Sequence, residues 1–223
     1  GRTVEEVVPP SVEIARRAAR GRALVALDVG PTGQLLEPTG TLRFEEAVDI
    51  FAQTVRAGVQ AGADLILIET MTDLQEARAA LLAAKENSSL PVIVTMTYEE
   101  RGRTFLGCDP ASAALTLEGM GADAIGVNCS LGPREMPPLV RELTRWSTLP
   151  IAIKPNAGLP DPGGAGYDIT AEEFAGSMAE LTGLGVKLYG GCCGTTPEYI
   201  ALLREKLAGC TIVQVPRQVP AAV

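Results

Sequence analysis

The chain has 223 residues, of which 46% are hydrophobic, and a formal net charge of -8 at pH 7. This length is enough for one large core or two small ones, and the acidic balance argues against a nucleic-acid surface. No apolar run approaches the roughly 18 residues that a membrane span needs, and the first residues do not read as a signal peptide. We therefore expect neither nucleic acid nor a membrane as a partner.

The composition also restricts the chemistry. The chain contains no histidine, which excludes a Ser-His-Asp triad, a histidine general base and every zinc site that uses histidine. Five cysteines in a chain without secretory features indicate reduced thiols and a cytoplasmic protein. Two of them, Cys108 and Cys210, read as incidental small apolar or surface residues.

Helix-like and strand-like segments alternate along the sequence. Residues 3–20 look helical apart from Pro9-Pro10, near which a helix should start or break. After them the pattern predicts, in chain order, a strand at 24–27, a helix at 44–61, a strand at 64–69, a helix at 73–85, a strand at 91–96, a helix at 111–120, a strand at 123–127, a helix at 133–147, a strand at 150–153, a glycine-proline loop at 158–166, a helix at 171–182, a strand at 186–189 and a helix at 197–207.

Six apolar strands that alternate with amphipathic helices predict an α/β fold with a parallel sheet. Two architectures compete, an open doubly wound sheet and a closed (β/α)8 TIM barrel. No Gly-x-Gly-x-x-Gly follows the first strand, which disfavours a dinucleotide-binding sheet. In a barrel, the polar residues that follow the strands would gather at one mouth, where active sites of that fold lie. They are Asp28, Glu69, Thr97, Cys129, Asn156 and Cys192.

The strand count falls short of a full barrel, which has eight strands and about 250 residues. We therefore expect about six of eight βα units, with the N-terminal two missing, in a piece of a larger protein. Residues 1–210 should form the domain and residues 211–223 an extended tail or linker. Unpaired strand edges would also invite self-association.

The most informative feature is a pair of adjacent cysteines in Gly-Gly-Cys-Cys-Gly-Thr, residues 190–195. A third cysteine, Cys129, lies in Gly-Val-Asn-Cys-Ser, and both segments follow short apolar runs. Thiolates at the ends of two strands predict a site in which Cys129, Cys192 and Cys193 bind zinc and leave the fourth position free for a substrate. The alternatives are a structural zinc site, which normally has four protein ligands, and three buried free thiols.

Several longer motifs carry a family resemblance. These are Gly-Val-Asn-Cys-Ser-Leu-Gly-Pro at 126–133, Gly-Gly-Cys-Cys-Gly-Thr-Thr-Pro at 190–197, Pro-Asn-Ala-Gly-Leu-Pro at 155–160, Gly-Ala-Asp-Leu-Ile-Leu-Ile-Glu-Thr at 62–70 and Gly-Pro-Thr-Gly at 30–33. From about residue 3 to residue 208, the sequence resembles the homocysteine S-methyltransferase family. Within that family it is most similar to the N-terminal homocysteine-binding domain of cobalamin-dependent methionine synthases.

The resemblance implies a (β/α)8 barrel that transfers a methyl group to the thiol of homocysteine and so makes methionine. It implies that Cys129, Cys192 and Cys193 hold one Zn²⁺ ion, that Glu69 holds the amino group of homocysteine, and that Asn156 approaches the metal when substrate is absent. The implied methyl donor is methylcobalamin with 5-methyltetrahydrofolate, bound by other domains or proteins. The family also has an acidic residue in an Asp-Gly segment of its first strand, which has no counterpart here.

Other roles stay open for the polar residues at strand ends. Glu69 could instead cap the helix that starts near Asp73. For Asp28 we favour a structural role in a turn, and for Asn128 hydrogen bonds to loop backbone. The rival to an enzyme is a non-catalytic module that binds zinc or homocysteine and needs a partner chain to complete the barrel.

Overall fold

The structure of the protein is a computed structural model that describes residues 1–160, 163 and 166–216. Part of the glycine-proline loop of residues 158–166 and the last seven residues of the predicted tail lie outside this range. Residues 211–216 have no regular secondary structure, but the backbone N–H of Val213 donates to the carbonyl of Thr182, so this stretch contacts the body of the domain. The domain limits themselves stay a prediction.

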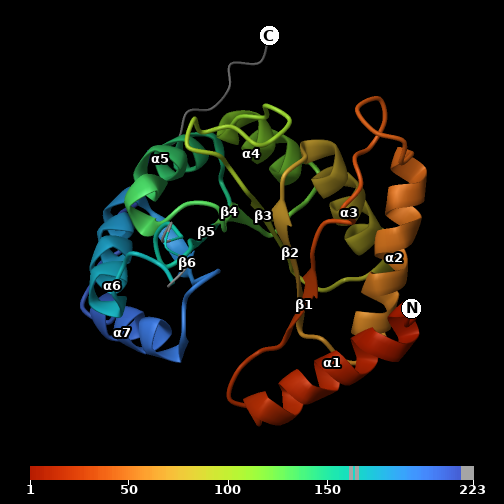
Figure 1. Ribbon diagram of the computed structural model, residues 1–223, viewed down its shortest axis with the longest axis horizontal. Helices are drawn as coiled ribbons and strands as arrows, with labels where there is room; N and C mark the ends of the chain where they lie inside the picture. Colours follow the sequence, from red (N-terminus) through yellow and green to blue (C-terminus); the bar gives the residue numbers. More distant parts are fainter. Residues whose placement is uncertain (161–162, 164–165, 217–223) are drawn as a thin grey trace.

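Six parallel strands form one sheet whose spatial order follows the chain order (Figure 1). The strands are β1 (Ala26–Val29), β2 (Leu65–Met71), β3 (Val92–Met96), β4 (Ala124–Asn128), β5 (Ile151–Lys154) and β6 (Val186–Tyr189). Every neighbouring pair in this order is parallel. A doubly wound sheet reverses its strand order at a switch point, and this sheet does not, so its topology is that of a TIM barrel.

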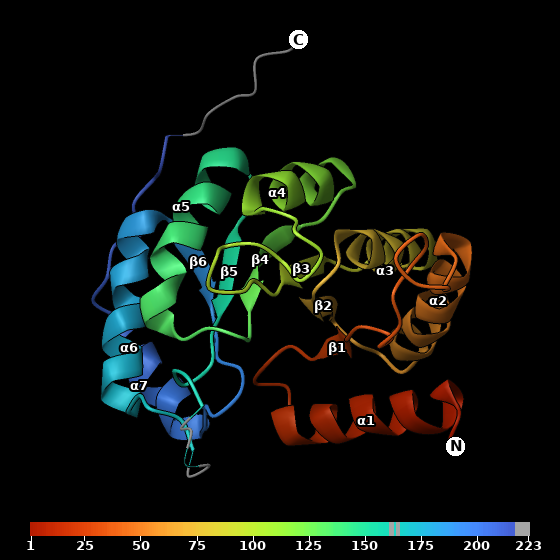
Figure 2. The same ribbon diagram turned by 45° about the horizontal axis from the view of Figure 1, so that its top comes forward.

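A helix follows each strand, a further helix precedes β1, and the helices lie on the outer side of the curved sheet (Figures 1 and 2). The α-helices are α1 (Val4–Ala19), α2 (Phe44–Gln60), α3 (Leu74–Asn87), α4 (Pro110–Gly119), α5 (Met136–Trp146), α6 (Ala171–Glu180) and α7 (Pro197–Leu207). Two short 3-10 helices, η1 (Pro133–Glu135) and η2 (Leu181–Leu184), adjoin α5 and α6. No described helix is both long enough and apolar enough to cross a membrane.

The helix starts have local causes in the sequence. The carboxylate of Asp73 accepts a hydrogen bond from the backbone N–H of Gln75 and caps α3. Asp109 caps α4 in the same way, and Thr170 forms a capping box with Glu173 at α6. Such caps satisfy backbone donors that have no partner inside the helix.

The expected break at Pro9-Pro10 is wrong, because α1 runs through both prolines. They lie just beyond the first turn, where each missing N–H leaves a carbonyl of the exposed residues Glu5 and Glu6 without a helical donor. These carbonyls lie at an exposed helix end, where water can replace the lost bonds.

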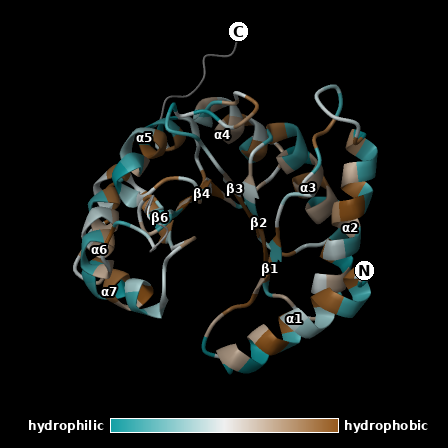
Figure 3. Cartoon of the chain, viewed as in Figure 1, coloured by the Kyte–Doolittle hydropathy of each residue, from teal (hydrophilic) through white to brown (hydrophobic). Residues whose placement is uncertain are grey.

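The core lies between the sheet and its outer helices. Along β2, the fully buried Ile66 and Ile68 alternate with half-buried residues, as expected for a strand with one face packed against helices. The central strands β3, β4 and β5 are buried almost throughout. Burial is lower in β1 and β6, each of which pairs with a single strand in the described chain. The outer helices carry both hydrophilic and hydrophobic residues (Figure 3), and their buried residues include Phe51 of α2, Leu81 of α3 and Phe174 of α6.

Candidate metal and substrate site

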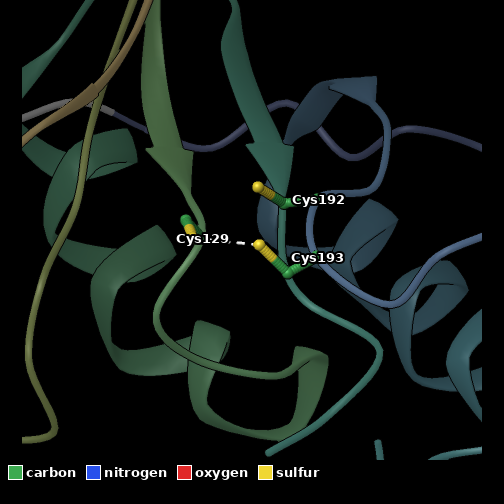
Figure 4. Close-up of side chains that lie close together, drawn as sticks. All are labelled: Cys129, Cys192 and Cys193. Atoms are coloured by element: carbon green, nitrogen blue, oxygen red, sulfur yellow. Dashed lines mark hydrogen bonds between the residues drawn. The ribbon is translucent and has the colours of Figure 1, made fainter. Parts of the chain in front are cut away.

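The sulfur atoms of Cys129, Cys192 and Cys193 all lie within 4.8 Å of one another. The Sγ atoms of Cys129 and Cys193 are 3.7 Å apart, and the Cys192 side chain points to the same side (Figure 4). Cys129 directly follows β4, and the cysteine pair comes three residues after β6. Because parallel strands end at the same edge of the sheet, two segments that are 63 residues apart in the chain meet here, as the sequence predicted.

The backbone holds the cysteine loops in fixed positions. The N–H of Cys129 donates to the carbonyl of Lys154, and the N–H of Cys192 donates to the carbonyl of Pro155. Both Cys129 and Ser130 have a φ of 61°, in the left-handed region that costs non-glycine residues free energy. Their sharp turn lets the chain leave β4 with the Cys129 sulfur beside the cysteine pair.

Asn128, the last residue of β4, is fully buried and ties this turn to β2. Its side-chain oxygen accepts hydrogen bonds from the N–H of Thr70 (2.8 Å) and the hydroxyl of Thr95 (2.7 Å). Its amide nitrogen donates to the hydroxyl of Thr70 and lies 3.8 Å from the sulfur of Cys192. The expectation that Asn128 bonds loop backbone is wrong, because the backbone N–H from which its side chain accepts belongs to Thr70 within β2. The network also extends to the sulfur of Cys192.

Asn156 lies in the loop after β5 and is 4% exposed. Its side-chain oxygen accepts a hydrogen bond from the N–H of Cys193 at 3.1 Å. The residue therefore lies beside the sulfur cluster, but its oxygen is engaged by backbone. Its expected approach to a metal stays a prediction.

The donor set fits a zinc ion. Tetrahedral zinc with Zn–S bonds of about 2.3 Å would hold its sulfurs about 3.8 Å apart, close to the separation between Cys129 and Cys193. Burial and then the neighbouring Cys129 sulfur raise the pKa of Cys192 to about 12, since crowded thiols resist ionisation together. A divalent cation among them would relieve that repulsion.

A second cluster of charged groups forms at the same end of the sheet. Glu69 of β2 and Lys154 of β5 form a direct ion pair, with the two side chains 20% and 21% exposed. Asp28 of β1 keeps contact with solvent, yet its pKa is raised, first by burial and then by Glu69, while Lys154 opposes the rise. The turn role expected for Asp28 is wrong, because the residue lies within β1. Helix capping by Glu69 is also not observed, since Asp73 caps α3.

Comparison with known proteins agrees with this arrangement. Residues 1–207 match the family model described as homocysteine S-methyltransferase. The chain belongs to the homocysteine S-methyltransferase family. Methionine synthase of Mycobacterium leprae (strain TN) is 35% identical over 197 residues, which cover 85% of this chain and 16% of that protein. Methionine synthase of Mycobacterium tuberculosis (strain ATCC 25618 / H37Rv) is 34% identical over 230 residues, which cover 96% of this chain and 19% of that protein. The chain thus spans less than a fifth of the length of these relatives.

Solved structures of the family share the fold. The apo form of the homocysteine methyltransferase MmuM from Escherichia coli has a TM-score of 0.75 at 24% identity, covering 92% of this chain and 75% of that one. Its metallated form has a TM-score of 0.73 at 23% identity, covering 91% and 70%. The expected barrel-type fold of the homocysteine S-methyltransferase family is therefore confirmed.

Sequence reasoning missed three residues of the site. Lys154 ends β5 and could have been found by the rule that selected the other strand-end residues. Thr70 has a φ of 61°, which no sequence pattern indicates for a β-branched residue. Tyr167 packs its ring against Gly194, where a side chain would overlap it. Desolvation and then the neighbouring Cys193 raise the pKa of the Tyr167 hydroxyl.

The other two cysteines lie apart from the cluster. The Cys108 thiol donates to the carbonyl of Asp109, and burial raises its pKa to about 11. The Cys210 thiol is exposed and donates to the carbonyl of Lys206 just after α7. Both positions agree with the incidental roles expected for these thiols.

Proposed function

We propose that this chain binds one Zn²⁺ ion through Cys129, Cys192 and Cys193 and uses it to activate homocysteine for methyl transfer. The observation that carries the proposal is the group of three sulfurs within 4.8 Å of one another. Structural zinc sites normally have four protein ligands, whereas catalytic sites keep one position open. Among the described residues the cluster supplies three candidate ligands, which leaves a place for the sulfur of a substrate.

The three cysteine thiolates suit this chemistry because they carry three negative charges. Together with a divalent cation they give a formal charge of -1, so a fourth sulfur in the site keeps its electron density. Zinc, when bound, favours the thiolate form of a thiol whose pKa is otherwise about 8.5 and fixes its position. The thiol proton of homocysteine passes to solvent, and the sulfur then forms the S–CH3 bond of methionine. The bond between the methyl group and its donor breaks, and the donor keeps the electron pair of that bond.

The remaining expected roles complete the proposal. Glu69 holds the ammonium group of homocysteine by a charge-assisted hydrogen bond. Asn156, which lies beside the cluster and accepts from the N–H of Cys193, approaches the metal when substrate is absent. The methyl donor is methylcobalamin, recharged by 5-methyltetrahydrofolate, on domains or proteins other than this chain. The reduced thiols support a cytoplasmic location.

A second candidate is a non-catalytic module that binds zinc or homocysteine and pairs with another chain. It is favoured by the edge strands β1 and β6, each of which has one strand neighbour among the described residues. A partner strand, or a second copy of this chain, could bind there.

Metal analysis of the purified chain tests the proposal first. We expect about one zinc per chain, lost in Cys192→Ser because two thiolates hold zinc far more weakly than three. Cys210→Ser is the matched control, since this exposed thiol lies outside the cluster, and it should keep its zinc.

Turnover separates the two candidates. Formation of methionine from homocysteine and methylcobalamin by the zinc-loaded chain would support the enzyme. Stoichiometric zinc without turnover would favour the module. A chain that holds no zinc would contradict both the enzyme and a zinc-binding module.

A further inference from the structure

The ion pair between Glu69 and Lys154 spans the inside of the sheet. Glu69 belongs to β2 and Lys154 to β5, with β3 and β4 between them. Lysine side chains at strand ends usually extend into water, whereas this one is 21% exposed and turns toward a carboxylate 85 residues away in the chain. Such a pair loses hydration at both ends, so its placement calls for an explanation.

Both ends of the pair are fixed to the segments that carry the cysteines. The Lys154 carbonyl accepts from the N–H of Cys129 at 3.1 Å. The stem of the Lys154 side chain lies against Gly190, where an added Cβ would come within 2.9 Å of its Cγ. On the other side, Thr70 follows Glu69 directly and is held by Asn128, whose amide lies 3.8 Å from the sulfur of Cys192. The charged pair and the sulfur cluster therefore belong to one connected site.

The charges in this site do not balance. Asp28 lies opposite Leu67 on the neighbouring strand, two residues before Glu69, and its pKa is influenced by both Glu69 and Lys154. Two carboxylates and one ammonium group thus lie at this end of the sheet, which can accept a further cation. Lys154 would then be left without its partner unless an anion arrived with that cation.

We infer that Lys154 binds the carboxylate of an α-amino-acid substrate, which inserts its ammonium and carboxylate groups between Glu69 and Lys154. The inference rests on the proposed function, to which it adds a residue that recognises the second charge of the substrate. One internal ion pair becomes two pairs with the ligand, so neither Glu69 nor Lys154 is left unpaired in a partly buried site. A ligand with an ammonium group alone would leave Lys154 without an ion-pair partner, and a ligand with a carboxylate alone would leave Glu69 without one. The site thereby selects zwitterions.

Ligand binding to the zinc-loaded chain, measured by titration calorimetry, tests this role. The two ligands are L-homocysteine and 3-aminopropane-1-thiol, which is homocysteine without its carboxylate. In Lys154→Met, we expect the affinity for homocysteine to fall by about 10- to 100-fold, the size of a lost charge-assisted pair. The affinity for 3-aminopropane-1-thiol should stay within about threefold of wild type or increase, because Glu69 is no longer occupied by lysine.

Two further variants serve as controls. Lys187→Met removes an exposed lysine from the neighbouring strand β6 and should change neither affinity. Lys154→Arg keeps the charge and should retain most of the affinity for homocysteine. Thermal unfolding would reveal whether Lys154→Met folds poorly, and in that case Lys154→Arg still tests the role of the charge.

The results separate this inference from the proposed function. If wild type binds both thiols, and Lys154→Met weakens both equally or neither, then Lys154 only neutralises Glu69 and the inference is overturned. If zinc-loaded wild type binds neither thiol, the proposed function fails, and this inference fails with it.

Discussion

At the residue scale, the site depends on backbone conformations that side chains must hold in place. Thr70, Cys129 and Ser130 each have a φ of 61°, and such conformations cost free energy that surrounding contacts must offset. Asn128 supplies those contacts, since its amide reaches Thr70 from the residue next to Cys129. One buried amide therefore positions both β2, which carries Glu69, and the turn that carries a cysteine.

Asp28 provides a pH-dependent test at this scale. The pKa of its carboxyl is raised above the ordinary value of 3.8, chiefly by burial and then by Glu69. Because the folded pKa exceeds the unfolded one, the ionised carboxylate destabilises the fold, and this cost appears as pH rises from 3.8 through the folded pKa. Asp28→Asn should therefore be more stable than wild type at pH 7, by a margin that shrinks on acidification.

Urea unfolding at a series of pH values measures this margin. Asp49→Asn is the control, because Asp49 is exposed on α2, and it should change stability by less than about 0.5 kcal/mol. A less stable Asp28→Asn protein at pH 7, or a margin that grows toward low pH, would contradict the assignment of Asp28 to this charge cluster.

At the element scale, the cysteines meet because β4 and β5 approach each other closely. Gly126 of β4 lies opposite Ala152 of β5, and a Cβ on Gly126 would overlap the carbonyl of Ala152. β5 in turn pairs with β6, which leads to the cysteine pair. A small residue in the middle of β4 thus sets the spacing of the three strands below the sulfur cluster.

Gly126→Ala should destabilise the chain by about 3 kcal/mol, because strand backbones cannot move apart without breaking the sheet. The control is Gly176→Ala in the middle of α6, where an added Cβ meets no atom within 4 Å. That variant should gain about 0.5 to 1 kcal/mol, since alanine loses less backbone entropy in a helix. Unfolding in urea measures both, and a Gly126→Ala protein as stable as wild type would refute the close approach.

Several elements could be predicted from sequence because their signals are local. The strand at 186–189 and the helix at 197–207 agree with β6 and α7 to the residue, since glycine and proline mark their ends. The proximity of the three cysteines could be predicted because parallel strands end at one edge of the sheet. The ion pair between Glu69 and Lys154 could not be predicted, because it depends on how far the sheet curves between β2 and β5. The continuous helix through Pro9-Pro10 was missed because water can replace the hydrogen bonds that the prolines remove near the exposed start of α1.

At the scale of the whole molecule, the six strands form a curved sheet whose carboxyl ends carry both clusters. Strand order alone separates this architecture from a doubly wound sheet. The chain matches its family over residues 1–207, yet spans less than a fifth of the mycobacterial methionine synthases. Its proposed part in the reaction is accordingly the activation of homocysteine, with the methyl group supplied from elsewhere.

X-ray absorption at the zinc edge tests the central claim, a three-sulfur zinc site with one open position. We expect about three sulfur neighbours near 2.3 Å and one lighter neighbour in the purified chain, and about four sulfur neighbours after homocysteine is added. Four sulfur neighbours before homocysteine is added, or a spectrum that homocysteine leaves unchanged, would contradict the account.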